Sequence, residues 1–315
     1  MVFKGDYSTF GYKVETAFDE TPVEGEQQKS LGIIPNVDFE DTFDYRDFYN
    51  VNNTTRDIML EAQGKLNSGA TVPFTLQNGR ALGLAMGTEV FSAGTPNTHT
   101  LSGGRTIPSM CLEAVYLGDN EFLRYLRGAK INTLSLEAVE GGEVRGDIEY
   151  QAARSEKSTN DASTVETSTD NPYMFYDSQM TIDGYDAFDM TTWKWSIKNN
   201  LSPKHVCRQT GGQYARFSLE GKREYEITAN IIIRDIATYN TEIYDKLMAG
   251  TVFDTSISMI RTSGTDDATI TASNCTIRSA PHNIPESGED VEVPVTIKPR
   301  SCSAVVRDSL AAYNA

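Results

Sequence analysis

The sequence predicts a mainly β fold, arranged as a β-sandwich or barrel with long hairpins and short flanking α-helices. The first observation behind this prediction is that apolar and polar residues alternate over several long stretches. Such alternation places the apolar side chains of a strand on one face. The second observation is that glycine pairs and other turn residues separate these stretches, as tight hairpin turns require. With 315 residues, the chain is long enough to bury its own core.

Two hairpins are expected from this pattern. In the first, apolar residues occupy alternate positions of residues 131–138 and again of residues 144–150, with a glycine pair between them. In the second, residues 217–219 lead through a turn at 221–223 into an alternating strand at 225–233. Each hairpin would have one apolar face and one polar face rich in carboxylates.

Three short helices are also predicted, each of them ended by a glycine. The helices cover residues 80–86, 120–127 and 241–249, and the glycines are Gly87, Gly128 and Gly250. Asp119 would cap the second helix, and Asn240 or Thr241 would cap the third.

Composition divides the chain into four parts. Residues 1–60 form an extended arm and loop, and residues 61–154 form a first β-rich half that contains a hairpin. Residues 155–171 are almost all small and polar, which predicts a flexible loop. Residues 172–315 form a second β-rich half with a hairpin and a helix. The similar halves suggest an internal duplication, but one continuous domain explains the pattern as well.

Acidic and aromatic residues alternate along the arm between positions 38 and 49. The aromatic residues are Phe39, Phe43, Tyr45, Phe48 and Tyr49. A calcium-binding EF-hand loop would explain the acids, but its glycine and closing glutamate are missing at the required offsets. We therefore expect these aromatic side chains to dock on a neighbouring surface.

The charge balance narrows the possible partners. The chain has 28 basic and 44 acidic residues, and its formal net charge is −16. Specific nucleic-acid binding normally requires a basic surface, so it is not expected here. No apolar run is long enough to span a membrane, and the N-terminal residues lack the apolar stretch of a signal peptide. We expect neither export nor membrane insertion.

The residues that usually carry chemistry are scattered. The four cysteines form no CxxC pair and the three histidines lie far apart, so we expect free thiols, no metal site and no cofactor. No motif of a hydrolase, a metalloprotease or a phosphate-binding loop is present, and an enzyme is not expected. Trp193 and Trp195 fall on the same face of a strand, where packing in a core or against a subunit is their expected role.

The beginning of the chain resembles a known family. Residues 11–22, with the sequence GYKVETAFDETP, are similar to the start of the major tail tube proteins of tailed viruses. Asp19-Glu20 stands where that family often has a glycine. The later order of motifs is similar too, from residues 71–74 through the first hairpin to the helix that ends at Gly250.

This resemblance implies a virion protein of the viral tail, made in the host cytoplasm. It implies a β-sandwich with a flanking helix, assembled as hexameric rings that stack into the tube that conducts viral DNA. The expected partners are further copies of the chain and other tail proteins, namely the terminator, the tape measure and the baseplate. DNA would pass through without specific binding. The acidic arm and the loop at 155–171 would suit contacts between subunits.

Ring assembly gives the polar hairpin faces a role. Long two-faced hairpins have free edges, and joining them around a ring removes these edges and leaves a channel. The candidate lumen-facing residues are Glu137, Glu143, Arg145, Asp147, Glu149, Glu220, Glu224 and Glu226. Together with Arg216 and Lys222 they amount to seven acids and three bases, or −4 per subunit and −24 per ring of six. A merely solvated sheet face would show the same pattern.

Two other functions fit parts of the sequence. A tail terminator or a distal-tail or baseplate hub would form one ring that does not stack. A carbohydrate-binding adhesion module belongs to a different class, and clustered exposed aromatic residues would favour it. The aromatic residues here are distributed by strand alternation instead.

Overall fold

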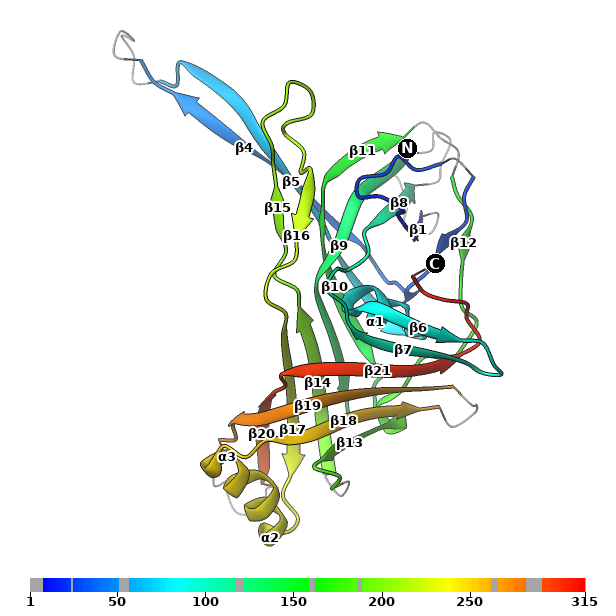
Figure 1. The fold of residues 1–315 in the computed structure, drawn as a ribbon, viewed down its shortest axis with the longest axis vertical. Helices are drawn as coiled ribbons and strands as arrows, with labels where there is room; N and C mark the ends of the chain where they lie inside the picture. The colour runs from blue at the N-terminus through cyan, green and yellow to red at the C-terminus, as the bar shows by residue number, and fades with distance from the viewer. Residues whose placement is uncertain are drawn as a thin grey trace.

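The computed structural model describes residues 8–23, 25–50, 57–116, 122–158, 162–185, 189–261, 266–281 and 291–314. Within these residues the protein is mostly β-sheet with short helical segments (Figure 1), which confirms the mainly β fold class. Three connected sheets, here called the main sheet, the end sheet and the cross sheet, make up most of the described fold, and a pair of short strands lies apart from them.

The main sheet is antiparallel, with the strand order β4–β5–β10–β9–β14–β17–β20. Its strands are β4 (Asp38–Phe48), β5 (Leu60–Leu76), β9 (Phe122–Val139), β10 (Arg145–Ala152), β14 (Asp189–Lys198), β17 (Glu224–Ile232) and β20 (Glu292–Lys298). The two-residue strand β3 (Gly32–Ile33) also pairs with β5. β9 and β10 form the first hairpin expected from the sequence.

The end sheet has the order β12–β2–β1–β8–β9–β11. Its own strands are β1 (Ser8–Val14), β2 (Gln28–Lys29), β8 (Met110–Tyr116), β11 (Arg154–Ser158) and β12 (Val165–Glu166). Strand β9 belongs to two sheets, because its first part pairs with β8 and β11 and its second part pairs with β10 and β14.

The cross sheet has the order β13–β18–β19–β21–β7–β6, and its strands run roughly across those of the main sheet (Figure 1). The strands are β6 (Gly87–Ser92), β7 (Asn97–Gly103), β13 (Ser178–Ile182), β18 (Phe253–Ile260), β19 (Asp267–Ser279) and β21 (Ser301–Asp308). The far end of β19 pairs with β20, which joins this sheet to the main sheet.

One apolar cluster fills the space between the main and cross sheets, and it contains side chains from Tyr12 to Tyr313. Trp193 and Trp195, exposed by 1% and 0%, lie in it, as expected for two residues on the same side of a strand. Because residues of both sequence halves contribute, the halves share a common core.

The first and third expected helices form. α1 (Arg80–Met86) ends at Gly87, whose φ of +93° is left-handed, and it contacts β6, β7 and β9. The third comprises α2 (Ile236–Tyr239), a π-helical turn (Asn240–Tyr244) and α3 (Asp245–Ala249), and ends at Gly250. Its cap is Asp235, which accepts hydrogen bonds from the amides of Ala237 and Thr238, and not Asn240 or Thr241. A 3₁₀ turn spans Phe175–Asp177. No helix of the described residues has the length and apolarity needed to cross a membrane.

The prediction of a helix at residues 120–127 was wrong, because residues 122–127 begin strand β9. Leu123 and Tyr125 point into a small apolar cluster beneath the end sheet. The local pattern fits a helix or a strand, and pairing with both β8 and β11 decides for the strand. Gly128 has a φ of +61° inside this strand, and Asp119 lies outside the described residues.

The second expected hairpin was also wrong. Residues 224–232 form β17, but its neighbours are β14 and β20. Residues 217–219 form the short strand β16 (Phe217–Leu219), which pairs with β15 (Ser202–Lys204). β14 offers β17 a longer apolar partner, since its core side carries two buried tryptophans.

The polar segment at 155–171 is partly ordered by pairing. Its first residues continue β11, and Val165–Glu166 pairs in parallel with Gln28–Lys29. Between these strands, the buried carboxylate of Glu113 accepts hydrogen bonds from the Ser163 amide and hydroxyl, both at 2.8 Å. Short polar residues therefore cover the end sheet although they have few apolar atoms to bury.

Gly146 provides a sharp test of packing in the main sheet. It lies opposite Phe74 in β5, and a Cβ atom there would come within 2.4 Å of the Phe74 ring. We expect Gly146→Val to lower the free energy of unfolding by about 1–3 kcal/mol. Asp147→Val, which alters the exposed side of the same strand, should change it by less than about 0.5 kcal/mol. Equal losses in denaturant titrations would contradict this packing.

Candidate assembly surfaces

The outer side of the main sheet is a broad polar surface, here called the open face: the side of β5, β10, β9, β14, β17 and β20 that points away from the core. Pairing aligns its side chains in rows across the strands. One row runs Arg145–Glu137–Lys194, the next Asp147–Ser135–Ser196–Glu226, and the third Glu149–Thr133–Lys198–Glu224. All of these residues are exposed or half-buried.

Six of the eight candidate lumen residues lie on this face, namely Glu137, Arg145, Asp147, Glu149, Glu224 and Glu226. Glu143 precedes β10, and its carboxylate accepts a hydrogen bond from Arg145 Nε at 2.7 Å. Glu220 precedes β17 and accepts hydrogen bonds from Lys130 Nζ at 2.6 Å and from the Ile107 amide. Burial alone would raise the pKa of Glu220, but these donors outweigh it and lower the pKa.

Sequence reasoning missed the cations of the open face. Lys194 and Lys198 come from β14 and Lys298 comes from β20, and neither strand had been assigned to this face. Lys194 Nζ lies 3.2 Å from Glu137 Oε2. The acids of the face are Glu137, Asp147, Glu149, Glu224, Glu226 and Glu292, and its bases are Arg145, Lys194, Lys198 and Lys298. These six acids and four bases sum to −2 per subunit, whereas the expected −4 was counted on a set that included Glu143, Glu220, Arg216 and Lys222 in place of Glu292 and the three lysines.

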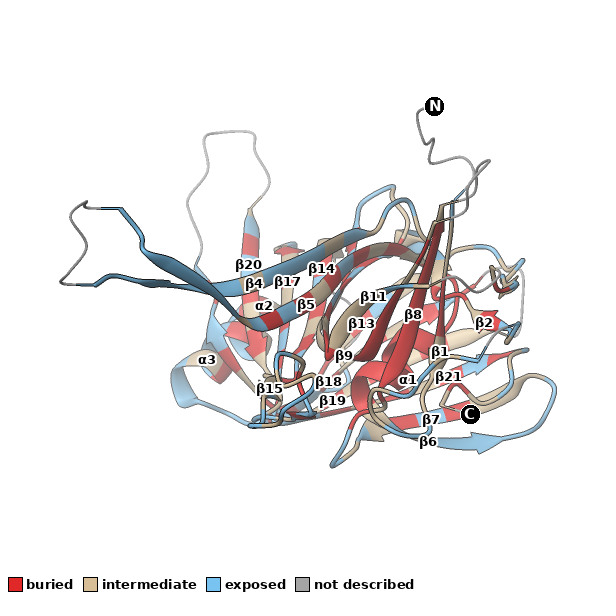
Figure 2. Cartoon of the chain, turned by 90° about the horizontal axis from the view of Figure 1, so that it is seen from above, coloured by how far each residue is buried: buried red, intermediate tan, exposed pale blue. Residues whose placement is uncertain are grey.

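The predicted arm is a projecting hairpin, formed by β4 and the first part of β5 (Figures 1 and 2). Phe39 lies at its base, with its ring centroid 6.5 Å from that of Phe10, and Phe43 contacts Tyr45 at 6.4 Å. Tyr45, Phe48 and Tyr49 are exposed by 54%, 50% and 68%. Three further apolar residues on the returning side of the hairpin are also exposed, namely Ile58, Met59 and Leu60. They do not alternate with acidic residues, so the sequence pattern did not identify them as candidate contacts.

Isolated two-stranded ribbons are marginally stable in water, and large exposed apolar groups favour a partner. The arm has both properties. It is therefore the part of the described surface best suited to contact another molecule.

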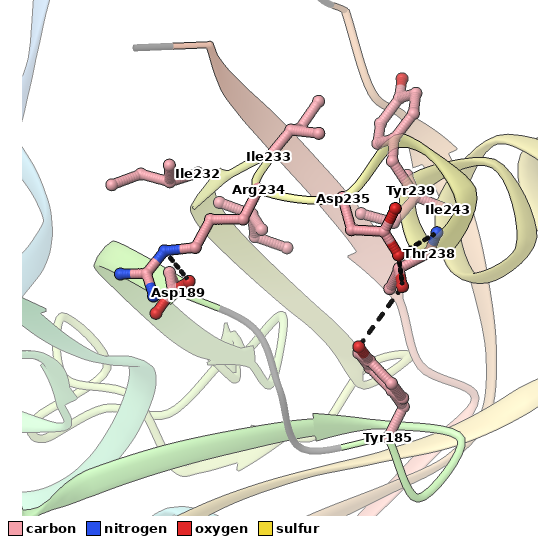
Figure 3. A pocket seen from close by; sticks show the side chains of 10 residues that line it. Tyr185, Asp189, Ile232, Ile233, Arg234, Asp235, Thr238, Tyr239 and Ile243 are labelled. Carbon is pink, nitrogen blue, oxygen red and sulfur yellow. Dashed lines mark hydrogen bonds and ion pairs between the residues drawn. The ribbon is translucent and has the colours of Figure 1, made fainter.

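An open pocket of about 360 Å³ lies where β17 enters α2 (Figure 3). Its polar groups are engaged with each other. Asp189 Oδ2 lies 2.6 Å from Arg234 Nε, and the Tyr185 hydroxyl is 3.4 Å from the Thr238 hydroxyl. Asp235 caps α2, and hydrogen bonds from Thr238 and the helix amides lower its pKa. Paired and capped groups of this kind offer no general acid or base.

A cluster of polar and charged side chains lies inside the protein. His99 is fully buried, with Nδ1 2.7 Å from Glu89 Oε1 and Nε2 3.1 Å from Asp308 Oδ1. Its ring stacks on Tyr313 at 3.9 Å, and the Tyr313 hydroxyl donates to Asp308. Glu89 also accepts hydrogen bonds from the amides of Tyr313 and Asn314. The cluster thus fastens the last described residues of the chain to β6, β7 and β21.

This cluster acts as a structural latch. Among the described residues, no group of three or more His, Cys, Asp or Glu side chains is arranged to hold a metal ion. Burial alone would lower the pKa of His99, but hydrogen bonds to Asp308 and Glu89 outweigh it and raise the pKa to about 9. His99 is therefore a cation at neutral pH, held between two carboxylates.

Comparison with known proteins shows which family the chain belongs to. The family model described as phage tail tube protein matches residues 5–299. The chain belongs to this family. It is therefore a structural, non-enzymatic virion protein of a tail tube, as the resemblance of its first residues indicated. The match also favours the tube subunit over the terminator, hub and adhesion alternatives.

Among solved structures, Hcp1 from Flavobacterium johnsoniae is 14% identical to the chain, with a TM-score of 0.26. The match covers 40% of the tail tube chain and 93% of Hcp1. No curated protein sequence matches the chain.

Proposed function

We propose that this tail tube protein forms hexameric rings that stack into the tube, and that the open face lines the channel through which viral DNA passes. The observation that carries the proposal is the open face itself, a polar surface that spans six strands and backs directly onto the core. At its ends the tube would contact the terminator, the tape measure and the baseplate. The subunit would be made in the host cytoplasm before assembly.

The edges of the main sheet support ring formation. Among the described strands, β4 pairs with β5 alone, so its other side offers backbone groups to a neighbour. At the opposite edge, β20 is paired with β19 only at Thr296–Lys298. Pro294 lies in the uncovered part and lacks an amide proton, which limits pairing there. Association around a closed ring protects such edges.

The charge of the open face suits a channel for DNA. At −2 per subunit, six copies would place −12 around the channel, with cations between the acids. This surface would weakly repel phosphates, and salt would confine the repulsion to about 8 Å from the wall. DNA would then pass without strong contacts that have to be broken. The missed lysines moderate the expected repulsion without reversing its sign.

Thiol labelling of assembled tubes tests the lining. Ser196 lies in the central row of the open face, and Ser196→Cys in a Cys207→Ser background places one accessible thiol there. We expect this thiol to react with a small maleimide in both monomers and tubes. A maleimide carrying a 5-kDa polymer should label it at least about tenfold more slowly in tubes, because the channel restricts entry.

Met248→Cys in the same background is the matched control, since Met248 is 69% exposed on α3. Its thiol should remain accessible to the large reagent in the tube. If tubes form and the large reagent labels Ser196→Cys as fast as it labels monomers, the open face does not line the channel.

A further inference from the structure

A second aromatic surface lies on the end sheet, on the side opposite its small apolar cluster. Pairing places Phe10 opposite Ala114 and Tyr116 opposite Phe122, and Phe39 packs against Phe10. The Tyr116 and Phe122 ring centroids are 5.8 Å apart. An open groove of about 460 Å³ runs along this surface, lined by Phe10, Ile34, Val37, Phe39, Ala114 and Tyr116. We call it the aromatic groove.

Two cations border the aromatic groove. Arg124 and Lys157 are direct partners across β9 and β11. The Arg124 guanidinium carbon lies 4.5 Å from the centroid of Phe39, and Lys157 Nζ lies 5.6 Å from that of Phe122. Arg124 also pairs with Asp41 at the base of the arm, whereas Lys157 is exposed. The groove thus offers apolar rings, a cationic rim and room for side chains.

The arm tip, here residues 44–50 and 57–63, has the complementary chemistry. It carries four acids, Asp44, Asp47, Asp57 and Glu61, and one base, Arg46; with Arg56 of the connecting sequence, residues 44–63 sum to −2. Phe48, Tyr49 and Leu60 are exposed at the same tip. An aromatic group with nearby carboxylates fits an apolar groove bordered by arginine and lysine.

We infer that the arm tip of one copy of this chain docks in the aromatic groove of a second copy. The arm leaves the body away from the end sheet, so the tip does not reach the groove of its own chain (Figures 1 and 2). Each subunit then has one projection and one receiving site in different places. Contacts of this head-to-tail kind link subunits in a closed ring or an open stack. The inference rests on the proposed function, because it assigns the receiving surface for tube assembly.

The pocket beside α2 is the competing receiver, and its chemistry fits less well. Its one cation, Arg234, is already paired with Asp189, and Asp235 adds a carboxylate to the lining. The aromatic groove has no charged residue in its lining, and its border carries the exposed Lys157 beside the Arg124–Asp41 ion pair. Lys157 is therefore the cation that attracts an acidic tip to the groove.

Mixed cysteine cross-linking tests the inference. Two proteins in a Cys207→Ser background, one with Tyr49→Cys and one with Tyr116→Cys, are mixed, assembled and oxidised. We expect a covalent dimer that forms only in the mixture and only on assembly. A mixture of Tyr49→Cys with Tyr185→Cys, which places the second thiol at the competing pocket, should give none.

A charge exchange provides a second readout that needs no new thiol. Lys157→Glu should raise the protein concentration needed for assembly about threefold to tenfold, and adding Asp47→Lys should restore it. Assembled tubes without the Tyr49–Tyr116 cross-link, or with the Tyr185 cross-link instead, would overturn the docking inference and leave the proposed function standing. If the Cys207→Ser protein never assembles at any concentration or salt, the proposed function fails, and the inference fails with it.

Discussion

Replacing His99 by leucine is expected to lower the free energy of unfolding by about 3–5 kcal/mol. The change removes the cation between Glu89 and Asp308 and leaves two carboxylates in a buried site. It also removes the ring that stacks on Tyr313, so the last described residues should detach first. Denaturant titration measures the loss, and hydrogen exchange at residues 309–314 measures the detachment.

His205→Leu is the matched control, because His205 is half-buried and its Nε2 lies 3.3 Å from the Leu66 carbonyl oxygen, with no carboxylate partner among the described ion pairs. Its loss should cost less than about 1 kcal/mol. A His99→Leu protein as stable as this control would show that the cluster does not hold the fold together.

The same cluster predicts how stability depends on pH. The pKa of His99 is raised to about 9 from an unfolded value of about 6.5, so its contribution is complete below pH 6.5 and is lost as the pH rises to 9. For Glu89 and Asp308, burial raises the pKa, but hydrogen bonds from His99 and backbone amides outweigh it and leave both values lowered. Their contribution is therefore lost on acidification. The cluster should stabilise the protein most between about pH 5 and 6.5, and His99→Leu should flatten the alkaline decline.

Removing the apolar side chains of the arm tip is expected to abolish assembly and leave the subunit folded. The triple variant is Phe48→Ser, Tyr49→Ser, Leu60→Ser. Each of the three replaced side chains is at least half exposed in the subunit, so their loss should change the free energy of unfolding of the monomer little. If burying each of these three side chains on docking contributes about 1.5 kcal/mol to assembly, losing all three raises the protein concentration needed for assembly by about a thousandfold or more. Sedimentation of a concentration series gives this threshold.

A second triple variant, Tyr176→Ser, Met248→Ser, Val252→Ser, removes equally exposed apolar groups from other elements. It should assemble at nearly the concentration of the unchanged protein. Equal thresholds for the two variants would assign the arm no special part in assembly. Circular dichroism of both variants should match the unchanged subunit.

Local patterns in the sequence were sufficient for much of the fold. Alternation identified the β9–β10 hairpin, and Gly87 marked the end of α1 because its left-handed backbone is cheap only for glycine. Alternation also placed six of the eight candidate residues on a common face, because side chains two positions apart must lie on the same side of a strand. These features depend on neighbours in the chain.

Features that depend on distant partners were not predictable in this way. β17 pairs with β14 and β20 because these strands complete a continuous core face, and no local signal distinguishes them from the nearer residues 217–219. That error hid Lys194 and Lys198, which reach the open face only through the correct pairing. The same reasoning explains residues 122–127, where two partner strands override a local helical pattern.

Electron microscopy of the purified protein over a salt series, from low to molar concentrations, would show directly whether the subunits stack into a tube. We expect hollow tubes of stacked rings, with six subunits in each ring and the open face of the main sheet on the inner wall. Single rings that never stack would contradict the tube proposal. A monomer that persists at every salt concentration would contradict the assembly account as a whole.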